Sequence, residues 1–326
     1  MAAKTAILKM LSAHRDTFVS GQELSERLGL SRTAIWKHIN ELRKAGYEIV
    51  SVKKSGYRLI EKPNVLSEAE IQSGLETDTL GRTVQYEDSV KSTQEVAHHL
   101  ARQGAKEGTI VVADEQTGGR GRLGRPWHSP KGTGIWVSMI LRPRIPPQQA
   151  PQLTLLAAVG VVKGIRAATG LECDIKWPND ILVHGKKLVG ILTELQADPD
   201  QVNSVIVGMG MNVNVKETDF PEELREIATS IRIQAGREVD RAEVLQQILK
   251  QTEILYQEYL REGFHLVKLL WESHAVSLGR VIQARTLQGT IVGNAVGLSD
   301  NGFLILEDDS GKRHEISSAD IDLPSA

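Results

Sequence analysis

Residues 118–127 read GGRGRLGRPW and lie between two strand-like segments, residues 109–114 (TIVVAD) and 134–141 (GIWVSMIL). Four glycines allow positive φ angles and close approach to a ligand, and three arginines can bind phosphate or carboxylate oxygens through paired hydrogen bonds. The segment is too polar for a packed helix or strand, so we predict a mobile cationic loop that closes over an anion. Composition alone also allows a solvated basic turn or a nucleic-acid tail. The position between two strands favours a ligand site, because binding residues concentrate on loops that a sheet supports.

The composition is that of an ordinary globular protein. The chain has 326 residues, of which 40% are hydrophobic and 25% charged, and this length predicts two or three domains. No apolar run approaches the ~20 residues of a membrane span, and the N-terminal Met-Ala-Ala-Lys does not resemble a signal peptide. We therefore expect a cytoplasmic protein without membrane contact. The single Cys173 excludes an internal disulfide framework and a cysteine-based zinc site, and we expect it to be buried.

Charge is unevenly distributed along the chain. Residues 1–62 hold 12 Lys or Arg against 6 Asp or Glu, a net charge of +6, whereas the remainder holds 27 against 35, a net charge of −8. A basic head on an acidic body predicts that the head alone meets a polyanion.

The basic head has helix-turn-helix spacing. Apolar periodicity predicts helices around residues 6–11, over 21–28 and over 31–45, with Gly29 at the bend between the last two. The polar side of the third helix would enter a DNA major groove. Its opposite, core-facing side collects Ile35, Ile39 and Leu42.

A hairpin follows the third helix, with strands at residues 47–52 and 57–60, and it resembles the wing of a winged helix. Lysines at its tip would add salt-sensitive affinity beside a phosphate backbone.

In the third helix, Ser31 is a good N-cap, and Trp36 flanks the buried stripe, where we expect it to pack against the core and not to contact a base. The alternative to DNA binding is a protein-docking module. The third helix and the wing both present positive charge, which favours DNA binding. The predicted DNA-contacting residues are Ser31, Arg32, Thr33, Trp36, Lys37, Lys53 and Lys54.

After a proline-containing linker at residues 61–66, the pattern becomes that of an α/β domain. Ser92 or Thr93 is the expected N-cap of one helix, and Asp240 caps a long helix whose apolar stripe indicates core packing. We expect a second flexible loop at residues 219–235. The predicted elements are helices at 70–75, 89–100, 151–169 and 240–259, and strands at 83–86, 109–114, 134–141, 173–176, 181–183, 188–195 and 204–207.

Lys176 ends one of these strands. Pro178 stops the strand, and ligand sites in α/β sheets form where strands end. A lysine that merely packs over Trp177 is the alternative. In residues 208–212 (GMGMN), two strand glycines admit a flat ligand, but no third glycine or helix follows, so this is not a dinucleotide fingerprint.

The pattern beyond residue 279 is all β. Short strands are predicted at residues 281–284, 290–296, 303–306 and 314–316, separated by Asp/Asn/Gly turns. They predict a small C-terminal barrel of the SH3-like kind.

Taken together, these motifs resemble the bifunctional biotin protein ligase and biotin operon repressor family of bacteria. The motifs that carry the resemblance are GRGRLGRPW (119–127), KWPND (176–180), KLVGIL (187–192), GMGMNV (208–213) and Ser92-Thr93-Gln94. The winged helix distinguishes this chain from short ligases, and the loop differs from that of lipoate ligases. The resemblance implies an α+β multidomain protein: a winged helix-turn-helix at 1–62, a ligase domain with a mixed sheet at 67–275, and an SH3-like domain at 279–326.

The resemblance implies a two-step reaction. Biotin and Mg-ATP give biotinyl-5′-adenylate and pyrophosphate, and a lysine of a carrier protein then takes the biotinyl group and releases AMP. Attack of a carboxylate on a phosphate brings two anions together, so fixed cations must offset their repulsion. No metal ligand is assigned, because ATP carries the Mg²⁺ with few protein ligands.

Site residues carry over by motif. Those expected to take part in catalysis are Lys176, Arg120 and Arg122. Those expected to bind biotin are Ser92, Thr93, Gln94, Gln116, Arg120, Gly121, Arg122 and Lys176. Those expected to bind the adenylate are Trp127, Asn179, Lys187 and Asn212.

The implied partners are biotin carboxyl carrier domains, of acetyl-CoA carboxylase or pyruvate carboxylase, and operator DNA with inverted-repeat half-sites. A homodimer is expected when the adenylate is bound. Two alternatives stay open: a non-catalytic biotin-sensing repressor, which needs no phosphate-holding cations, and a lipoate-type ligase, which needs an apolar slot without ureido partners.

Overall fold

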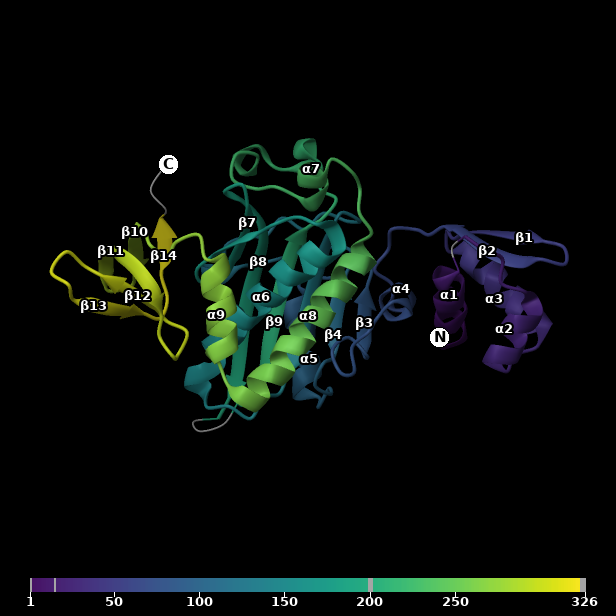
Figure 1. The fold of residues 1–326 in the computed structure, drawn as a ribbon, viewed down its shortest axis with the longest axis horizontal. Coiled ribbons are helices and arrows are strands. Elements are labelled where there is room, and N and C mark those ends of the chain that lie inside the picture. Colours follow the sequence, from purple (N-terminus) through teal and green to yellow (C-terminus); the bar gives the residue numbers. More distant parts are fainter. Residues whose placement is uncertain (1, 15, 199–201, 323–326) are drawn as a thin grey trace. The chain divides into compact units, whose positions relative to one another are not determined.

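The computed structural model describes residues 2–14, 16–198 and 202–322, and the chain divides into two compact units, Met1–Glu76 and Thr77–Ala326 (Figure 1). The first unit holds the basic head, and the second holds both the α/β region and the C-terminal strands. The three-domain division expected from the sequence stays a prediction, and its last residues, 323–326, lie outside the described part of the chain.

The first unit is a winged helix-turn-helix, as predicted. Its elements are α1 (Ala2–Ala13), α2 (Gly21–Leu28), α3 (Arg32–Lys44), β1 (Glu48–Val52), β2 (Gly56–Glu61) and α4 (Glu68–Ser73). α2 and α3 begin at Ser20 and Ser31, whose hydroxyls accept hydrogen bonds from the N–H groups of Glu23 (3.0 Å) and Ala34 (3.2 Å). Gly29 ends α2 with a φ of 64°, a left-handed conformation that glycine adopts readily.

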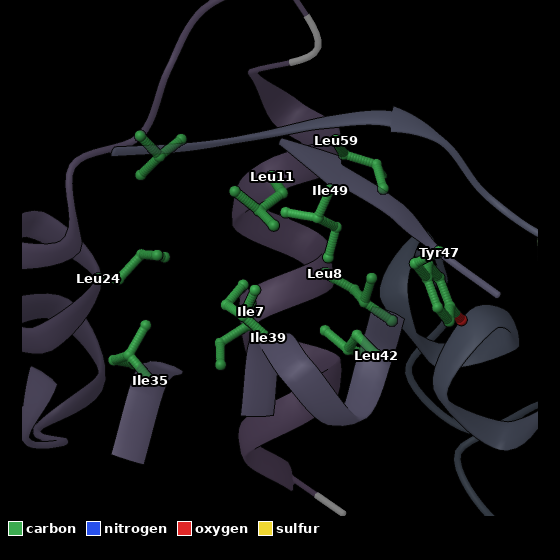
Figure 2. Packing of buried hydrophobic residues seen from close by; sticks show 11 residues of the cluster. Ile7, Leu8, Leu11, Leu24, Ile35, Ile39, Leu42, Tyr47, Ile49 and Leu59 are labelled. Atoms are coloured by element: carbon green, nitrogen blue, oxygen red, sulfur yellow. The ribbon is translucent and has the colours of Figure 1, made fainter. Parts of the chain in front are cut away.

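One apolar cluster holds this unit together. Figure 2 shows side chains from the three helices and the hairpin pointing toward one another. The hydroxyl of Tyr47 donates to Glu70 Oε1 (2.6 Å), and Ala69 packs on the cluster, so α4 belongs with the first unit although it follows the expected linker. The buried members are Ile7, Leu8, Leu11, Val19, Leu24, Ile35, Ile39, Leu42, Tyr47, Ile49 and Leu59.

Within the described residues, seven strands form one mixed sheet in the second unit, in the order β3-β4-β5-β9-β8-β7-β6. β3 and β4 are parallel, and the other neighbours are antiparallel. The mixed sheet is therefore confirmed. The strands are β3 (Val84–Glu87), β4 (Ile110–Ala113), β5 (Gly134–Leu141), β6 (Asp174–Lys176), β7 (Asp180–Val183), β8 (Lys186–Ala197) and β9 (Val202–Asn212).

The two faces of this sheet are covered differently. The helices concerned are α5 (Thr93–Arg102), α6 (Ala150–Thr169) and α8 (Arg241–Glu262). Successive side chains of a strand point to opposite faces. On β8, Thr193 bonds Thr154 of α6 (2.7 Å), whereas Glu194 contacts His98 of α5 (2.8 Å). The even-numbered residues of β8 therefore face α5, and α6, with α8 beside it in Figure 1, covers the other face.

The segment Pro147–Thr169, which includes α6, is long and apolar enough to cross a membrane by composition. In the fold, 67% of its most apolar window is buried, as in a core helix. Cys173, which follows this segment, is also buried as predicted, and burial raises the pKa of its thiol to about 12.

The C-terminal part is a five-stranded antiparallel sheet within the described residues, in the order β13-β12-β11-β10-β14, which confirms the predicted small β domain. Its strands are β10 (Val281–Thr286), β11 (Gly289–Leu298), β12 (Leu304–Glu307), β13 (Arg313–Ile316) and β14 (Asp320–Asp322). The sequence prediction missed β14 and also α9 (His265–His274), the helix that precedes the C-terminal sheet. β14 has a single buried residue, Ile321, between two acids, so no apolar pattern marks it.

Candidate functional site

A cavity of about 780 Å³ opens on the α5 face of the central sheet. Its floor is formed by β8 and β9, and one end lies at the start of α5. The glycine- and arginine-rich loop of residues 118–127, the segment 213–235 and β14 form its sides. Every predicted catalytic, biotin-binding and adenylate-binding residue lines this cavity.

Two paired glycines make the floor flat. Gly190 of β8 pairs with Gly210 of β9, and a Cβ atom at Gly210 would lie 2.4 Å from Nε1 of Trp127. The indole therefore lies directly on bare backbone, where any side chain would exclude it. Its Nε1 is buried without a hydrogen-bond partner in the described residues, and the ammonium of Lys187 lies 5.3 Å from the ring centroid. Gly208 and Gly210 were predicted to admit a flat ligand; in the structure Gly210 admits the indole of Trp127 and Gly208 admits the side chain of Gln94.

The α5 end of the cavity is lined with hydroxyl and amide groups. Ser92 is the N-cap of α5, but its side chain makes no capping bond, so its buried hydroxyl is available to a ligand. Thr93 bonds Gln116 Oε1 through its N–H (2.9 Å) and its hydroxyl (3.1 Å), and its hydroxyl also contacts Ser138 Oγ (2.8 Å). These residues come together as the resemblance implies, although they are far apart in sequence.

The side chain of Gln94 is hydrogen-bonded within the protein. Its Nε2 donates to the carbonyls of Leu192 and Ile206 (both 3.2 Å), and its Oε1 accepts from Ser138 Oγ (2.9 Å). Gly208 allows this approach, because a Cβ atom there would lie 2.5 Å from Gln94 Oε1. Gln94 therefore ties α5 to β8 and β9, and both of its amide hydrogens are already donated.

Cations gather at the opposite end. Lys176 ends β6 as predicted, lines the cavity, and makes no side-chain hydrogen bond or ion pair with any residue that the structure describes. Lys187 forms an ion pair with Asp180 (2.7 Å). Asn179 is anchored by its Nδ2, which donates to the carbonyl of Ile191 (2.9 Å). Lys176 is thus held only by its strand, and its charge is free for a ligand.

Arg122 joins three parts of the second unit. Its Nη1 donates to Asn179 Oδ1 (3.2 Å), and its Nη2 donates to Ser318 Oγ (2.9 Å) and to the carbonyl of Ala319 (3.2 Å). Burial lowers the pKa of this guanidinium, while Asp320 and Asp180 act in the opposite direction. Arg125 of the same loop also forms an ion pair with Asp320 of β14. The C-terminal sheet therefore holds the loop, a contact that the sequence pattern did not indicate.

Arg120 lies elsewhere. Its guanidinium contacts Glu194 of β8 (3.3 Å) and lies 3.9 Å from Glu95 of α5, so it sits toward the hydroxyl-lined end and not beside Arg122. Gly121, between the two arginines, donates its N–H to the carbonyl of Arg125 (2.8 Å) and so tightens the loop. The loop thus spans the length of the cavity.

The segment 213–235 closes the remaining side. It is pinned to β8 because the N–H of Lys187 donates to the carbonyl of Ile227 (2.8 Å) and the N–H of Thr229 donates to that of Lys187 (2.9 Å). Phe220 contributes an apolar wall, and buried Asn212 ends β9 at the cavity. The sequence prediction missed Phe220 as a lining residue. An aromatic side chain within the predicted loop could have indicated that part of this loop is buried.

Comparisons with known proteins follow the same three regions. The chain matches the family models of an HTH domain (residues 4–58), the biotin/lipoate A/B protein ligase family (86–212) and the biotin protein ligase C terminal domain (277–323). It is 56% identical to the bifunctional ligase/repressor BirA of Bacillus spizizenii, over 97% of both chains, and 29% identical to that of Escherichia coli, over 95% of this chain and 94% of the relative. A solved biotin protein ligase from Aquifex aeolicus, in complex with biotin and ATP, matches with a TM-score of 0.64 and 33% identity, over 74% of this chain and 98% of the other.

Proposed function

This chain belongs to the family of bifunctional biotin ligase/repressors, and from that premise we infer that it activates biotin with ATP and attaches it to carrier proteins, and that its first unit binds operator DNA. The observation that carries the ligase activity is the cavity itself. One end offers the hydroxyl of Ser92 to a neutral polar head group, and the other offers the unpaired ammonium of Lys176 to anions.

The first step forms a bond between a carboxylate oxygen of biotin and the α-phosphorus of ATP, and pyrophosphate leaves with the electrons of the broken P–O bond. We assign Lys176 to the space between the two reacting anions, where its charge offsets their repulsion and the charge that develops on the phosphate. Lys187, over the indole of Trp127, places a second cation beside the nucleotide. The indole of Trp127 would stack on the adenine, and the side chain of Asn212 would help orient the adenosine.

Magnesium would accompany ATP. Asp180 is a carboxylate at the cationic end, and Lys187 already pairs with it at 2.7 Å. The described residues include no cluster of three or more carboxylate, imidazole or thiol groups able to hold a metal ion. The donor set fits a cation held mainly by the phosphates, with few protein ligands.

The second step transfers the biotinyl group to the amine of a carrier lysine, and AMP leaves. The reactive adenylate must be retained until the carrier arrives, and we assign this task to the loop of residues 118–127. Arg122 and Arg125 fix the loop to the C-terminal sheet through Ser318, Ala319 and Asp320. The loop then excludes water from the acyl phosphate.

Weakening this attachment should release adenylate. We expect Asp320→Asn, which removes the charge that Arg125 contacts, to raise the rate of adenylate escape by up to about fivefold, because exposed ion pairs contribute about 0–1 kcal/mol. Escaped adenylate labels bystander lysines, so the measurement is biotin incorporated into a protein mixture without carrier. Asp322→Asn is the matched control, since Asp322 lies on the same strand but pairs with Arg285. Equal labelling by the two variants would contradict a retaining role for Asp320.

The first unit presents its predicted DNA-contacting residues to solvent. All seven are exposed, and Trp36, for which packing had been favoured, is 58% exposed. We propose that α3 enters the major groove of operator DNA and that Lys53 and Lys54, at the β1–β2 turn, contact the phosphate backbone.

The wing contact can be measured separately from base recognition. We expect Lys53→Ala to weaken binding to operator and unrelated DNA alike and to reduce the slope of log K against log salt by about 1, because one phosphate contact is lost. The measurement is a salt titration of DNA affinity. Glu48→Gln is the control, because Glu48 begins β1, at the end of the strand away from the turn. A loss confined to the operator would show instead that Lys53 reads bases.

We propose a cytoplasmic location, and carrier domains of biotin-dependent carboxylases as acceptors of the biotinyl group.

We also propose that the protein is a homodimer when it binds DNA. The observation that supports a dimer is a free strand edge. β7 pairs with β8 only as far as Gly190, and beyond Ile191 no described residue pairs with the outer edge of β8. An open strand edge is a ready site for pairing with a second chain.

One experiment tests the ligase activity. The protein is incubated with ATP, labelled biotin or lipoate, and a carrier domain, and covalent incorporation is measured. Incorporation of biotin that depends on ATP and on the acceptor lysine is expected. Incorporation of lipoate alone would support the lipoate-type alternative, and binding of biotin without incorporation would support a sensor.

A further inference from the structure

His128 directly follows the loop of residues 118–127 and lines the cavity. Its Nε2 lies 3.2 Å from the carbonyl oxygen of Asp219, a residue of the segment 213–235. A carbonyl oxygen can only accept a hydrogen bond, so Nε2 carries a proton and donates it to Asp219. Among the residues that the structure describes, this is the only hydrogen bond or ion pair between residues 118–128 and 213–235. His128 therefore joins two sides of the cavity.

The backbone of His128 is fixed on the loop side. The N–H of Trp127 donates to the carbonyl of Gly119 (2.9 Å). The N–H of Gln116 donates to the carbonyl of Ser129 (3.2 Å), and Gln116 Nε2 donates to the Ser129 hydroxyl (3.1 Å). Both neighbours of His128 are thus anchored, and the imidazole reaches from a fixed point toward the segment.

On the segment side, the bond holds the peptide group that leads into Phe220. Asp219 ends the short helix η3 (Glu217–Asp219), and Phe220 is the next residue. Phe220 lines the cavity and is 3% exposed, and its own carbonyl accepts from Arg225 Nε (3.2 Å). Because His128 holds one carbonyl and Arg225 holds the next, the phenyl ring is fixed as a wall of the cavity.

Little else holds this part of the segment. Within the described residues, the stretch 216–226 makes two hydrogen bonds to other parts of the second unit: the one from His128, and one from Lys186 Nζ to the carbonyl of Arg225 (3.1 Å). Lys186 belongs to β8 and does not line the cavity, so its bond ties the segment to the sheet and not to the loop. The bond from His128 is therefore the one that makes the loop and the segment move together.

We propose that His128 is a positioning residue that locks the loop of residues 118–127 to the segment 213–235 over the bound biotinyl-adenylate, so that the two sides open and close as one. The inference rests on the proposed ligase function and adds a control on retention to it: the adenylate leaves only through an opening that breaks the bond between His128 and Asp219. The imidazole takes no part in the chemistry of either step. Retention of the adenylate should then depend on His128, and the rate of its formation should not.

The test uses the full-length protein, loaded with adenylate made from ATP and labelled biotin in the absence of carrier. Excess unlabelled biotin is added, and the loss of label from the protein gives the escape rate. We expect His128→Phe, which keeps a ring but has no donor, to raise the escape rate about two- to tenfold, the range typical of one lost hydrogen bond. His128→Gln, whose amide can donate to the same carbonyl, should bring escape back near the parental rate. The single-turnover rate of adenylate formation should stay parental in both variants.

Lys186→Met is the matched control, because it removes the other side-chain hydrogen bond to this part of the segment and leaves the loop untouched. It should leave the escape rate close to that of the parent. An equal rise in Lys186→Met would overturn the proposal, as would unchanged escape from His128→Phe or a failure of His128→Gln to restore retention.

Hydrogen exchange tests the joint movement directly. In the adenylate-bound parent, the amides of residues 118–127 and 216–226 should report the same free energy of opening, because one event exposes both. In His128→Phe the two stretches should differ. Independent opening in the parent would overturn the proposal and leave the ligase function intact, whereas a parent that forms no adenylate would overturn the ligase function itself.

Discussion

Lys176→Ala should lower the rate of biotinyl-adenylate formation by about 10²–10³-fold, or about 3–4 kcal/mol of transition-state stabilisation, the loss typical of one preorganised group that faces developing charge. The structure supports this size of effect because the ammonium has no ion pair with any described residue that would offset its charge. Its strand is held by pairing of Ile175 with Ile181, which the change does not touch. The protein should therefore stay folded. The measurement is pyrophosphate release in single turnover with biotin and ATP.

Two variants sharpen this prediction. Lys176→Arg keeps the charge and should retain more activity than Lys176→Ala. Lys186→Ala is the matched control, because Lys186 begins β8, two strands across from β6, but donates to the carbonyl of Arg225 (3.1 Å) and does not line the cavity. If Lys176→Ala forms adenylate at the parental rate, Lys176 is a packing residue over Trp177 and the assignment is wrong.

The sequence was sufficient to predict the elements that have a strong local signal. The strand over residues 134–141 is an unbroken apolar run, and β5 occupies the same residues. Ser31 and Asp240 were predicted as N-caps, and both accept hydrogen bonds at the start of their helices. Motif resemblance likewise predicted which residues line the cavity, because those motifs fall at strand ends and loops that face one side of the sheet.

The sequence was not sufficient for contacts that depend on tertiary placement. Nothing in residues 318–320 indicated that they would meet Arg122 and Arg125, because the pairing spans nearly 200 positions along the chain. Arg120 and Arg122 are two residues apart and looked equivalent. In the structure the Arg120 guanidinium contacts Glu194, whereas the Arg122 guanidinium contacts Asn179 and Ser318, so the two groups lie at opposite ends of the cavity.

The second large effect concerns DNA binding. One winged helix reads one half-site with modest affinity, and a dimer on an inverted repeat joins two such contributions, which can raise affinity by about 10²–10⁴-fold. We expect biotinyl-adenylate to drive this step. Binding would order the loop of residues 118–127 and the second predicted loop, residues 219–235, which both line the cavity. Segments that are already ordered lose less entropy when they pack against a second subunit.

The free edge of β8 makes this coupling testable. Leu195 lies on that edge and is 39% exposed, so Leu195→Lys should place a charge in the subunit interface, as edge strands use lysine to prevent pairing. We expect the variant to form adenylate at the parental rate but to remain monomeric in sedimentation and to bind operator no more tightly with adenylate than without it. Leu260→Lys, at a leucine of α8 that is 48% exposed, is the matched control and should dimerise normally. A parent protein that stays monomeric with adenylate yet binds operator tightly would refute the coupling and leave the ligase function intact.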